Sequence, residues 1–453
     1  MDLISLAQKV IATNSVTTQG TRALGEFLAR TVLSELDVTV SWQEGETAAD
    51  ANLLAYKPGQ ADLPALLLTS HLDTVPPGDR TLWTKTSSNP FAPVIEGDRL
   101  YGLGSADAKL DWLAKAAALA RFRGRSFVRP VLFTGTYAEE RGMFGARRLL
   151  DNLPCPIGYA FVGEPCELKL VHAHKGIVIC ALHLAGRALS PRPGRITTQV
   201  VMGRSAHSST PARGENAIVK ALHTVLQDPL FVPVSIHGGD AVNKVPARCE
   251  VIGLEAQPPS AEQYVPLDPA MVTTLGQLAA GLAALTAEFT EEEAEFSPPT
   301  LTVNLGEIHA EQNTATLLFD LRPLPGQDVD LLLARVQRLA TQVSESSTVA
   351  VTLEVRRRNP AFFTPYDAAI LTTGLDVLAR VGLPLETAAK AGCTEAGLYS
   401  EQGIPALVYG AGVAGGNIHA PNEWASLSQL ERSVDFYAGL IETFCLTHSL
   451  SAA

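Results

Sequence analysis

Strand-like and helix-like segments alternate through the first third of this chain and return near its end. Apolar runs typical of buried strands are PALLLTSHLD (64–73), PVLFTGTYAEE (130–140), GYAFVGEP (158–165) and PALVYGAG (405–412). Helical periodicity is found in KLDWLAKAAALARF (109–122), GMFGARRLLDN (142–152), CTEAGLYSEQG (393–403) and a long segment from Ser426. This alternation predicts an α/β domain with a mostly parallel sheet flanked by helices.

Between these parts the pattern changes to antiparallel-like strands, among them GIVICALHLAG, RITTQVVMG and TATLLFDLRP. Helices are expected near 214–227, 269–287 and 328–346, and a proline-rich connector at 256–269. We therefore predict an enlarged α+β lid or dimerisation-type domain at 177–363, inserted into a discontinuous catalytic domain at 1–176 and 364–453. A faint echo between residues 234–253 and 301–321 suggests that the insert has two related halves.

Length and charge narrow the classes of function. A chain of 453 residues favours two domains, and a net charge of -12 argues against nucleic acid or an anionic membrane as partner. The N-terminal segment reads as an amphipathic helix rather than a signal peptide, and no stretch is expected to span a bilayer. Six cysteines without CxxC spacing are typical of reduced thiols, so we expect a cytoplasmic location.

Two histidines and three carboxylates are expected at the carboxyl ends of strand-like runs, where ligands bind in open α/β sheets. These candidate metal ligands are His71, Asp107, Glu140, Glu164 and His419. The set suits two divalent ions, with zinc preferred and cobalt or manganese as alternatives. Each residue alone has a simpler interpretation, such as a loop histidine, a helix N-cap or a surface acid.

Neighbours of these residues suggest hydrolysis. Asp73 lies two positions after His71 and is expected to accept a hydrogen bond from its imidazole. Glu139 precedes Glu140 at the predicted strand end, so one acid could bind metal while the other acts as general base and then acid.

Four further polar or glycine positions and one histidine are candidates for substrate contact. His207, in a loop before the helix predicted at 214–227, could stabilise the oxyanion of a tetrahedral intermediate. Arg322 and Asn304 could hold a substrate carboxylate, with a strand-edge ion pair as the alternative. Thr394 in GCTEAG and Gly412 in a glycine-rich loop complete the set.

Taken together, the chain resembles the M20 family of zinc aminoacylases and peptidases. The motifs HLDTVP, YGLGSADAK, YAEERGMFGA, FVGEP, AHKG, SAHSSTPARGENAI, DLRPLPG, GCTEAG and IHAPNE occur in the order found in that family. The resemblance implies that Asp107 bridges two metals, one held with His71 and Glu164 and the other with Glu140 and His419. It also implies the general-base role of Glu139, the orienting role of Asp73 and the oxyanion role of His207, and a cis peptide after Asp107.

Several motifs look most like the acetylornithine deacetylase branch, but the chain departs from the family in places. Leu110 and Asp111 stand where glycine usually follows, and no arginine lies near Leu398 as in the desuccinylase branch. The insert resembles the enlarged lid of PepV-type dipeptidases, which implies a monomer, with His207 acting in cis, rather than a homodimer.

We therefore expect a metal-dependent amidohydrolase that removes the acyl group from an N-acyl amino acid. A dipeptidase or carboxypeptidase of the same family is the alternative. A catalytically silent homologue that binds a ligand is less favoured, because the candidate ligands and Glu139 are all present.

Overall fold

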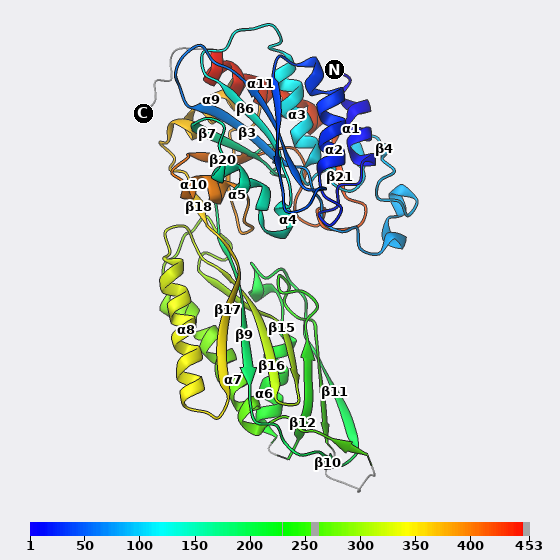
Figure 1. Cartoon of the computed structure of the whole chain (residues 1–453), viewed down its shortest axis with the longest axis vertical. Helices are drawn as coiled ribbons and strands as arrows, with labels where there is room; N and C mark the ends of the chain where they lie inside the picture. Colours follow the sequence, from blue (N-terminus) through cyan, green and yellow to red (C-terminus); the bar gives the residue numbers. More distant parts are fainter. Residues whose placement is uncertain (229, 255–261, 447–453) are drawn as a thin grey trace. The chain divides into compact units, whose positions relative to one another are not determined.

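The computed structural model describes residues 1–228, 230–254 and 262–446, and these form two compact units. The first contains Met1–Ala173, Phe362–Ala389 and the residues from Thr394 onward, and the second contains His174–Ala361 and Lys390–Cys393. Figure 1 shows the elements of each unit. The predicted boundaries fell after residues 176 and 363. The short return of Lys390–Cys393 to the second unit was not predicted, because four residues carry no periodic signal.

The first unit is built on a mixed sheet whose order is β1-β2-β6-β3-β7-β20-β8-β18, with β19 paired to β8. The four central strands β6, β3, β7 and β20 are parallel, whereas β1, β2 and β8 join antiparallel. The expected parallel pairing thus holds at the centre of the sheet. The strands are β1 (Thr39–Glu44), β2 (Ala51–Lys57), β3 (Ala65–His71), β6 (Val131–Thr136), β7 (Ile157–Gly163), β8 (Leu170–His174), β18 (Phe362–Phe363), β19 (Thr387–Lys390) and β20 (Ala406–Tyr409).

Helices cover both faces of this sheet, and every residue of β3 is buried as a result. One face packs against a large apolar core to which Leu68, Phe133 and Phe161 contribute from the strands. The helices of this core are α1 (Leu3–Ala12), α2 (Arg22–Thr31), α3 (Lys109–Ala120), α9 (Ala369–Arg380) and α11 (Leu427–Ile441). The remaining helices are α4 (Glu139–Gly142), α5 (Phe144–Asp151) and α10 (Ala396–Glu401), and a small sheet joins β4 (Val94–Glu96), β5 (Arg99–Tyr101) and β21 (Trp424–Ser426).

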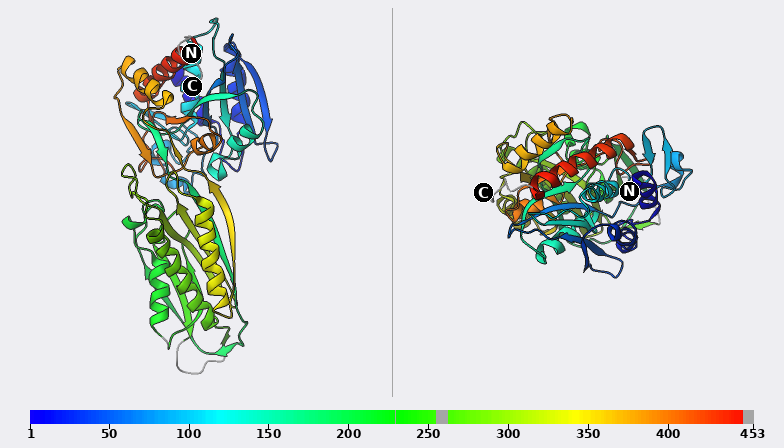
Figure 2. Two further views of the ribbon diagram at one scale, coloured as in Figure 1. Left: turned by 90° about the vertical axis from the view of Figure 1, so that its left-hand side faces the viewer. Right: turned by 90° about the horizontal axis from the view of Figure 1, so that it is seen from above.

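The second unit is an antiparallel sheet of order β11-β13-β12-β15-β16-β9-β17 with helices on one face (Figure 2). Alternating residues such as Leu317 and Phe319 enter a core shared with α6, α7 and α8. The elements are β9 (Ile177–Ala185), β10 (Arg192–Pro193), β11 (Ile196–Met202), α6 (Ala217–Gln227), β12 (Val232–Gly238), β13 (Arg248–Leu254), β14 (Gln263–Tyr264), α7 (Pro269–Glu288), β15 (Thr302–Glu311), β16 (Thr314–Arg322), α8 (Val329–Glu345) and β17 (Ala350–Asn359).

The two echoing segments are the hairpins β12–β13 and β15–β16. Each follows a helix, α6 or α7, and the hairpins meet at the antiparallel pair β12–β15 in the middle of the sheet. The unit therefore contains two halves of similar order, each made of a helix followed by a β-hairpin. Of the connector predicted at 256–269, residues 256–261 lie outside the described residues, and β14 and the start of α7 occupy part of the rest.

Helix α7 of the second unit is long and apolar. Within the described residues, α7 is 20 residues long with a mean hydropathy of 1.4 in its most apolar window, enough by length and composition to cross a bilayer. Its Met271, Leu275, Leu278 and Leu282 are fully buried in the core of the second unit. The helix is apolar because it serves as a core helix of this unit.

Candidate active site

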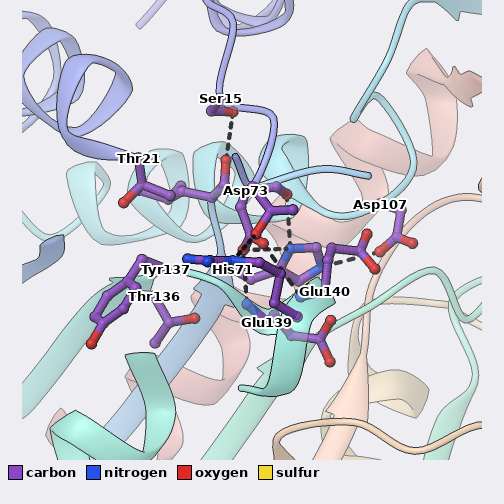
Figure 3. A network of polar contacts seen from close by, with 12 residues as sticks. Ser15, Thr21, His71, Asp73, Asp107, Thr136, Tyr137, Glu139 and Glu140 are labelled. Carbon is purple, nitrogen blue, oxygen red and sulfur yellow. Dashed lines mark hydrogen bonds and ion pairs between the residues drawn. The ribbon is translucent and has the colours of Figure 1, made fainter. Parts of the chain in front are cut away.

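The first unit brings all five candidate metal ligands together around Asp107. Figure 3 shows Asp107 with His71 and Glu140 close by. One oxygen of this carboxylate, Oδ1, lies 3.1 Å from Nε2 of His71. The other, Oδ2, lies 3.1 Å from Nε2 of His419, whose same nitrogen is 3.3 Å from Oε1 of Glu140. Each oxygen of Asp107 therefore faces a different histidine.

Two ligand sets share this carboxylate. The first is His71, Asp107 and Glu164, and the second is Asp107, Glu140 and His419. Within each set the donor atoms lie within 4.8 Å of one another. Ligands on a tetrahedral zinc ion with bonds of about 2.0–2.1 Å are separated by roughly 3.3 Å. The donor atoms thus need only small side-chain rotations to hold an ion in each set.

The positions of the ligands along the chain differ from the prediction. His71 ends β3 and Glu164 directly follows β7, as expected. Glu140 instead belongs to the first turn of α4, because β6 ends at Thr136 and Ala138 turns the backbone in a left-handed conformation, φ 51°. Asp107 lies in the turn before α3 and His419 in the loop between β20 and β21, so neither ends a strand.

Asp73 connects several of these residues, although not as predicted. Nδ1 of His71 lies 3.0 Å from the backbone carbonyl of Asp73 and 3.7 Å from the nearer carboxylate oxygen. The two carboxylate oxygens instead accept the backbone N–H groups of Glu139 (3.0 Å) and Glu140 (3.3 Å). Donation from Nδ1 leaves the lone pair on Nε2, the nitrogen that faces Asp107.

Negative charge is concentrated at this point. Burial alone would lower the pKa of His419, but hydrogen bonds and charges from Asp107 and Glu140 outweigh it and raise the pKa to about 11. The pKa of His71 is raised in the same way, against burial, by Asp107 and Asp73. Burial and the charge of Asp107 raise the pKa of Glu140. Such an arrangement attracts cations, and two imidazoles with three carboxylates form a donor set that suits zinc.

Two buried acids beside the site were missed in the sequence. Glu423 accepts the backbone N–H groups of Gly104 (3.2 Å), Ala106 (2.8 Å) and Asp107 (3.1 Å). Burial and the nearby Asp107 raise its pKa to about 7. Glu395 accepts a hydrogen bond from Thr136 at 2.6 Å, and its burial raises its pKa to about 7. The only sequence signal was their presence in the motifs IHAPNE and GCTEAG.

The peptide bond between Asp107 and Ala108 is cis in this structure, as the resemblance implied. Thr394 is buried, and its hydroxyl accepts the N–H of Ala396 at the start of α10. Gly412 has a φ of 97°, and its N–H donates to the side chain of Gln429. Both residues belong to the first unit.

His207, Asn304 and Arg322 belong to the second unit. The Ser209 backbone N–H donates to Nδ1 of His207 at 3.1 Å. Asn304 is buried and donates to the backbone carbonyls of Val242 and Lys244, and Lys244 bridges to His207. Asn304 therefore holds in place the loop that contains Val242 and Lys244, and this loop pairs with the backbone of His207.

Arg322 is buried in an ion pair with Asp320, at 2.8 Å, and also donates to Ser208. This contact is the alternative considered for it from the sequence. The ion pair occupies part of the guanidinium fork that a substrate carboxylate would need.

A sequence profile of the peptidase family M20/M25/M40 matches residues 67–443. The chain belongs to this family. An acetylornithine deacetylase from Photorhabdus laumondii is 33% identical over 278 residues, which cover 55% of this chain and 65% of that relative. A similar deacetylase from Yersinia pestis is aligned over 48% of its length, so these matches span about half to two thirds of the relatives.

Solved structures agree on the fold. The aminoacylhistidine dipeptidase of Vibrio alginolyticus superimposes with a TM-score of 0.69 at 16% identity, covering 97% of this chain and 96% of that one. A Bacillus subtilis protein described as a dinuclear metal-binding peptidase gives a TM-score of 0.55 at 14% identity, with coverage of 97% and 96%. The predicted α/β fold with an inserted domain is thereby confirmed.

Proposed function

We propose that this protein is a metal-dependent amidohydrolase that removes the acyl group from an N-acyl amino acid. The observation that carries the proposal is the carboxylate of Asp107, with its two oxygens 3.1 Å from His71 and His419 on opposite sides. This arrangement suits a bridging ligand between two divalent ions. The ions would be held by His71, Asp107 and Glu164 and by Asp107, Glu140 and His419, with zinc preferred over cobalt or manganese.

Bound divalent ions would polarise the scissile carbonyl and make water more acidic near neutral pH. The protein supplies the proton transfer. Glu139 is buried beside Glu140 at the start of α4, and the contact of its backbone N–H with Asp73 fixes its position. Its carboxylate is placed to accept a proton from the attacking water and to return it to the departing nitrogen.

His207 is proposed as the donor to the oxyanion. Because Ser209 donates its backbone N–H to Nδ1, the neutral imidazole carries its proton on Nε2. That tautomer can donate a hydrogen bond to a developing negative charge. The resemblance to enlarged-lid dipeptidases supports donation within one chain and a monomeric protein.

A small apolar pocket beside His419 is proposed to receive an apolar group of the substrate. Its volume is about 200 Å³, which is below the roughly 300–1,000 Å³ of typical ligand sites, so it suits a single side chain or acyl group. The lining includes Val75, Pro77, Leu82, Trp83 and Leu103.

Deacylation is preferred over dipeptide hydrolysis because the motifs and the curated relatives point to acetylornithine deacetylases. Dipeptidase activity is the alternative, supported by the dipeptidase fold neighbour. A silent binding protein is disfavoured by the complete ligand set. The six cysteines, all within the described residues, form no disulfide with one another, which supports the proposal of a reducing, cytoplasmic location.

A hydrolysis panel tests the proposal. Purified protein loaded with zinc or cobalt is assayed against acetyl-, succinyl- and formyl-amino acids beside dipeptides. We expect cleavage of at least one acyl amino acid, and Glu139→Ala should abolish it while the metal content stays near that of the wild type. Cleavage of dipeptides alone would favour the alternative. No cleavage of any member, with no bound divalent ion, would refute the enzyme proposal.

A further inference from the structure

The second unit carries a cluster of two histidines and a glutamate outside the candidate active site. His237 on β12 and His309 on β15 are direct cross-strand partners, with ring centroids 4.4 Å apart. Glu311 lies two positions after His309 and therefore projects from the same face of the sheet. Its Oε1 is 2.9 Å from Nε2 of His237, and one donor atom from each side chain lies within 4.8 Å of the others.

This cluster lies on the sheet face that the helices leave open. Along β15, Ile308 and Ala310 are buried in the core, whereas His309 and Glu311 are exposed. The same cross-strand row continues from His309 to Thr316 on β16 and to His183 on β9. Three of the ten histidines in the chain thus share one row on this face.

A simple ion pair explains only part of the cluster. The contact of His237 with Glu311 joins two partly exposed side chains, and such surface pairs contribute little to stability. It does not involve His309, whose ring is inclined at 55° to that of His237. His309 nevertheless offers a donor atom within 4.8 Å of those of His237 and Glu311. Two imidazoles and one carboxylate are a typical three-ligand set for zinc, with a fourth position open.

We propose that His237, His309 and Glu311 bind one divalent transition-metal ion of the zinc, nickel or copper class. Imidazole nitrogens prefer these metals over magnesium or calcium. The hydrogen-bonded pair β12–β15 holds the two histidine backbones opposite each other. Exposure of the cluster means that the ion would exchange with solvent and that water would complete its coordination.

The test uses the full-length holoenzyme without an affinity tag. Zinc is titrated calorimetrically into protein whose catalytic metals are already bound, and retention on an immobilised-nickel column is measured beside it. We expect one additional ion per chain, a rise in unfolding temperature on adding zinc, and retention on the column. The double variant His237→Asn/His309→Asn should lose all three effects, and Glu311→Gln should weaken them, while hydrolysis of the acyl amino acid stays unchanged.

His183→Asn is the matched control, since it removes an imidazole from the same face but outside the cluster. It should keep the additional ion. The proposal is overturned if the wild type takes up no additional ion, or if the double variant binds as many ions as the wild type. Equal losses in the double variant and the control would overturn it too. A zinc-dependent dimer that disappears in the double variant would support the site and assign its fourth ligand to a second copy.

Discussion

Replacing Asp73 with asparagine should weaken the site without changing any ligand. The Asp73 carboxylate accepts the backbone N–H groups of Glu139 at 3.0 Å and Glu140 at 3.3 Å, one on each oxygen. Asparagine keeps the shape but has one acceptor oxygen and no charge. One of the two N–H groups would then face an NH₂ group.

The size of the effect follows from these two contacts. A hydrogen bond to a charged group contributes about 1.5–3 kcal/mol and a neutral one about 0.5–1.5 kcal/mol, so the bond that remains weakens by about 1 kcal/mol, and the N–H that faces the NH₂ group loses at least as much. Two bonds give about 2 kcal/mol, which corresponds to about a 30-fold lower rate if the whole cost falls on the transition state. Residues that orient metal ligands typically contribute about 10–100-fold to metal affinity or activity, so the two estimates agree.

The assay is kcat/KM on the best acyl amino acid at a buffered zinc concentration, with metal content measured on the same sample. The matched control is Asp268→Asn. Asp268 is also buried and accepts two backbone N–H groups, from Ala270 at 3.0 Å and Arg187 at 3.3 Å, but it lies in the second unit. A 30-fold loss in Asp73→Asn with little loss in the control is expected. Activity within threefold of the wild type, or equal losses in both variants, would refute the positioning role of Asp73.

Local patterns in the sequence were sufficient to predict the strands β3 and β7, which position His71 and Glu164. β3 and β7 are buried on both faces, so they appear as continuous apolar runs, and His71 and Glu164 could be placed at their ends. The turn that starts α4 could not be foreseen. It depends on the left-handed backbone conformation of Ala138. No residue in YAEERG is of a type that indicates such a conformation in the sequence.

The loop residues of the site depend on contacts between distant parts of the chain. Asp107 is held by Glu423, which is 316 residues away in sequence, and local periodicity has no information about such a pair. The same limit applies to the ion pair of Arg322 with Asp320. These residues lie two apart on β16 and were recognisable as a possible pair, but only the structure shows that both are buried.

Three further outcomes are expected. His207→Asn should lower kcat by about 10²–10³-fold with unchanged metal content, the usual cost of one lost oxyanion donor, and an unchanged kcat would exclude that role. Leu82→Trp should fill the pocket beside His419 and raise KM about tenfold for substrates with large apolar groups, equivalent to ~1.4 kcal/mol of lost burial, while acetylglycine serves as the control. Lys115→Met should lower the free energy of unfolding of the first unit by about 3–5 kcal/mol in urea, because it removes the only cationic partner that forms an ion pair with the buried Asp111 among the described residues, at 2.7 Å. The double variant Asp111→Asn/Lys115→Met should recover part of that stability, since Tyr437 and Ser70 still bond residue 111. If the double variant loses as much unfolding free energy as the two single variants added together, the two residues are not coupled.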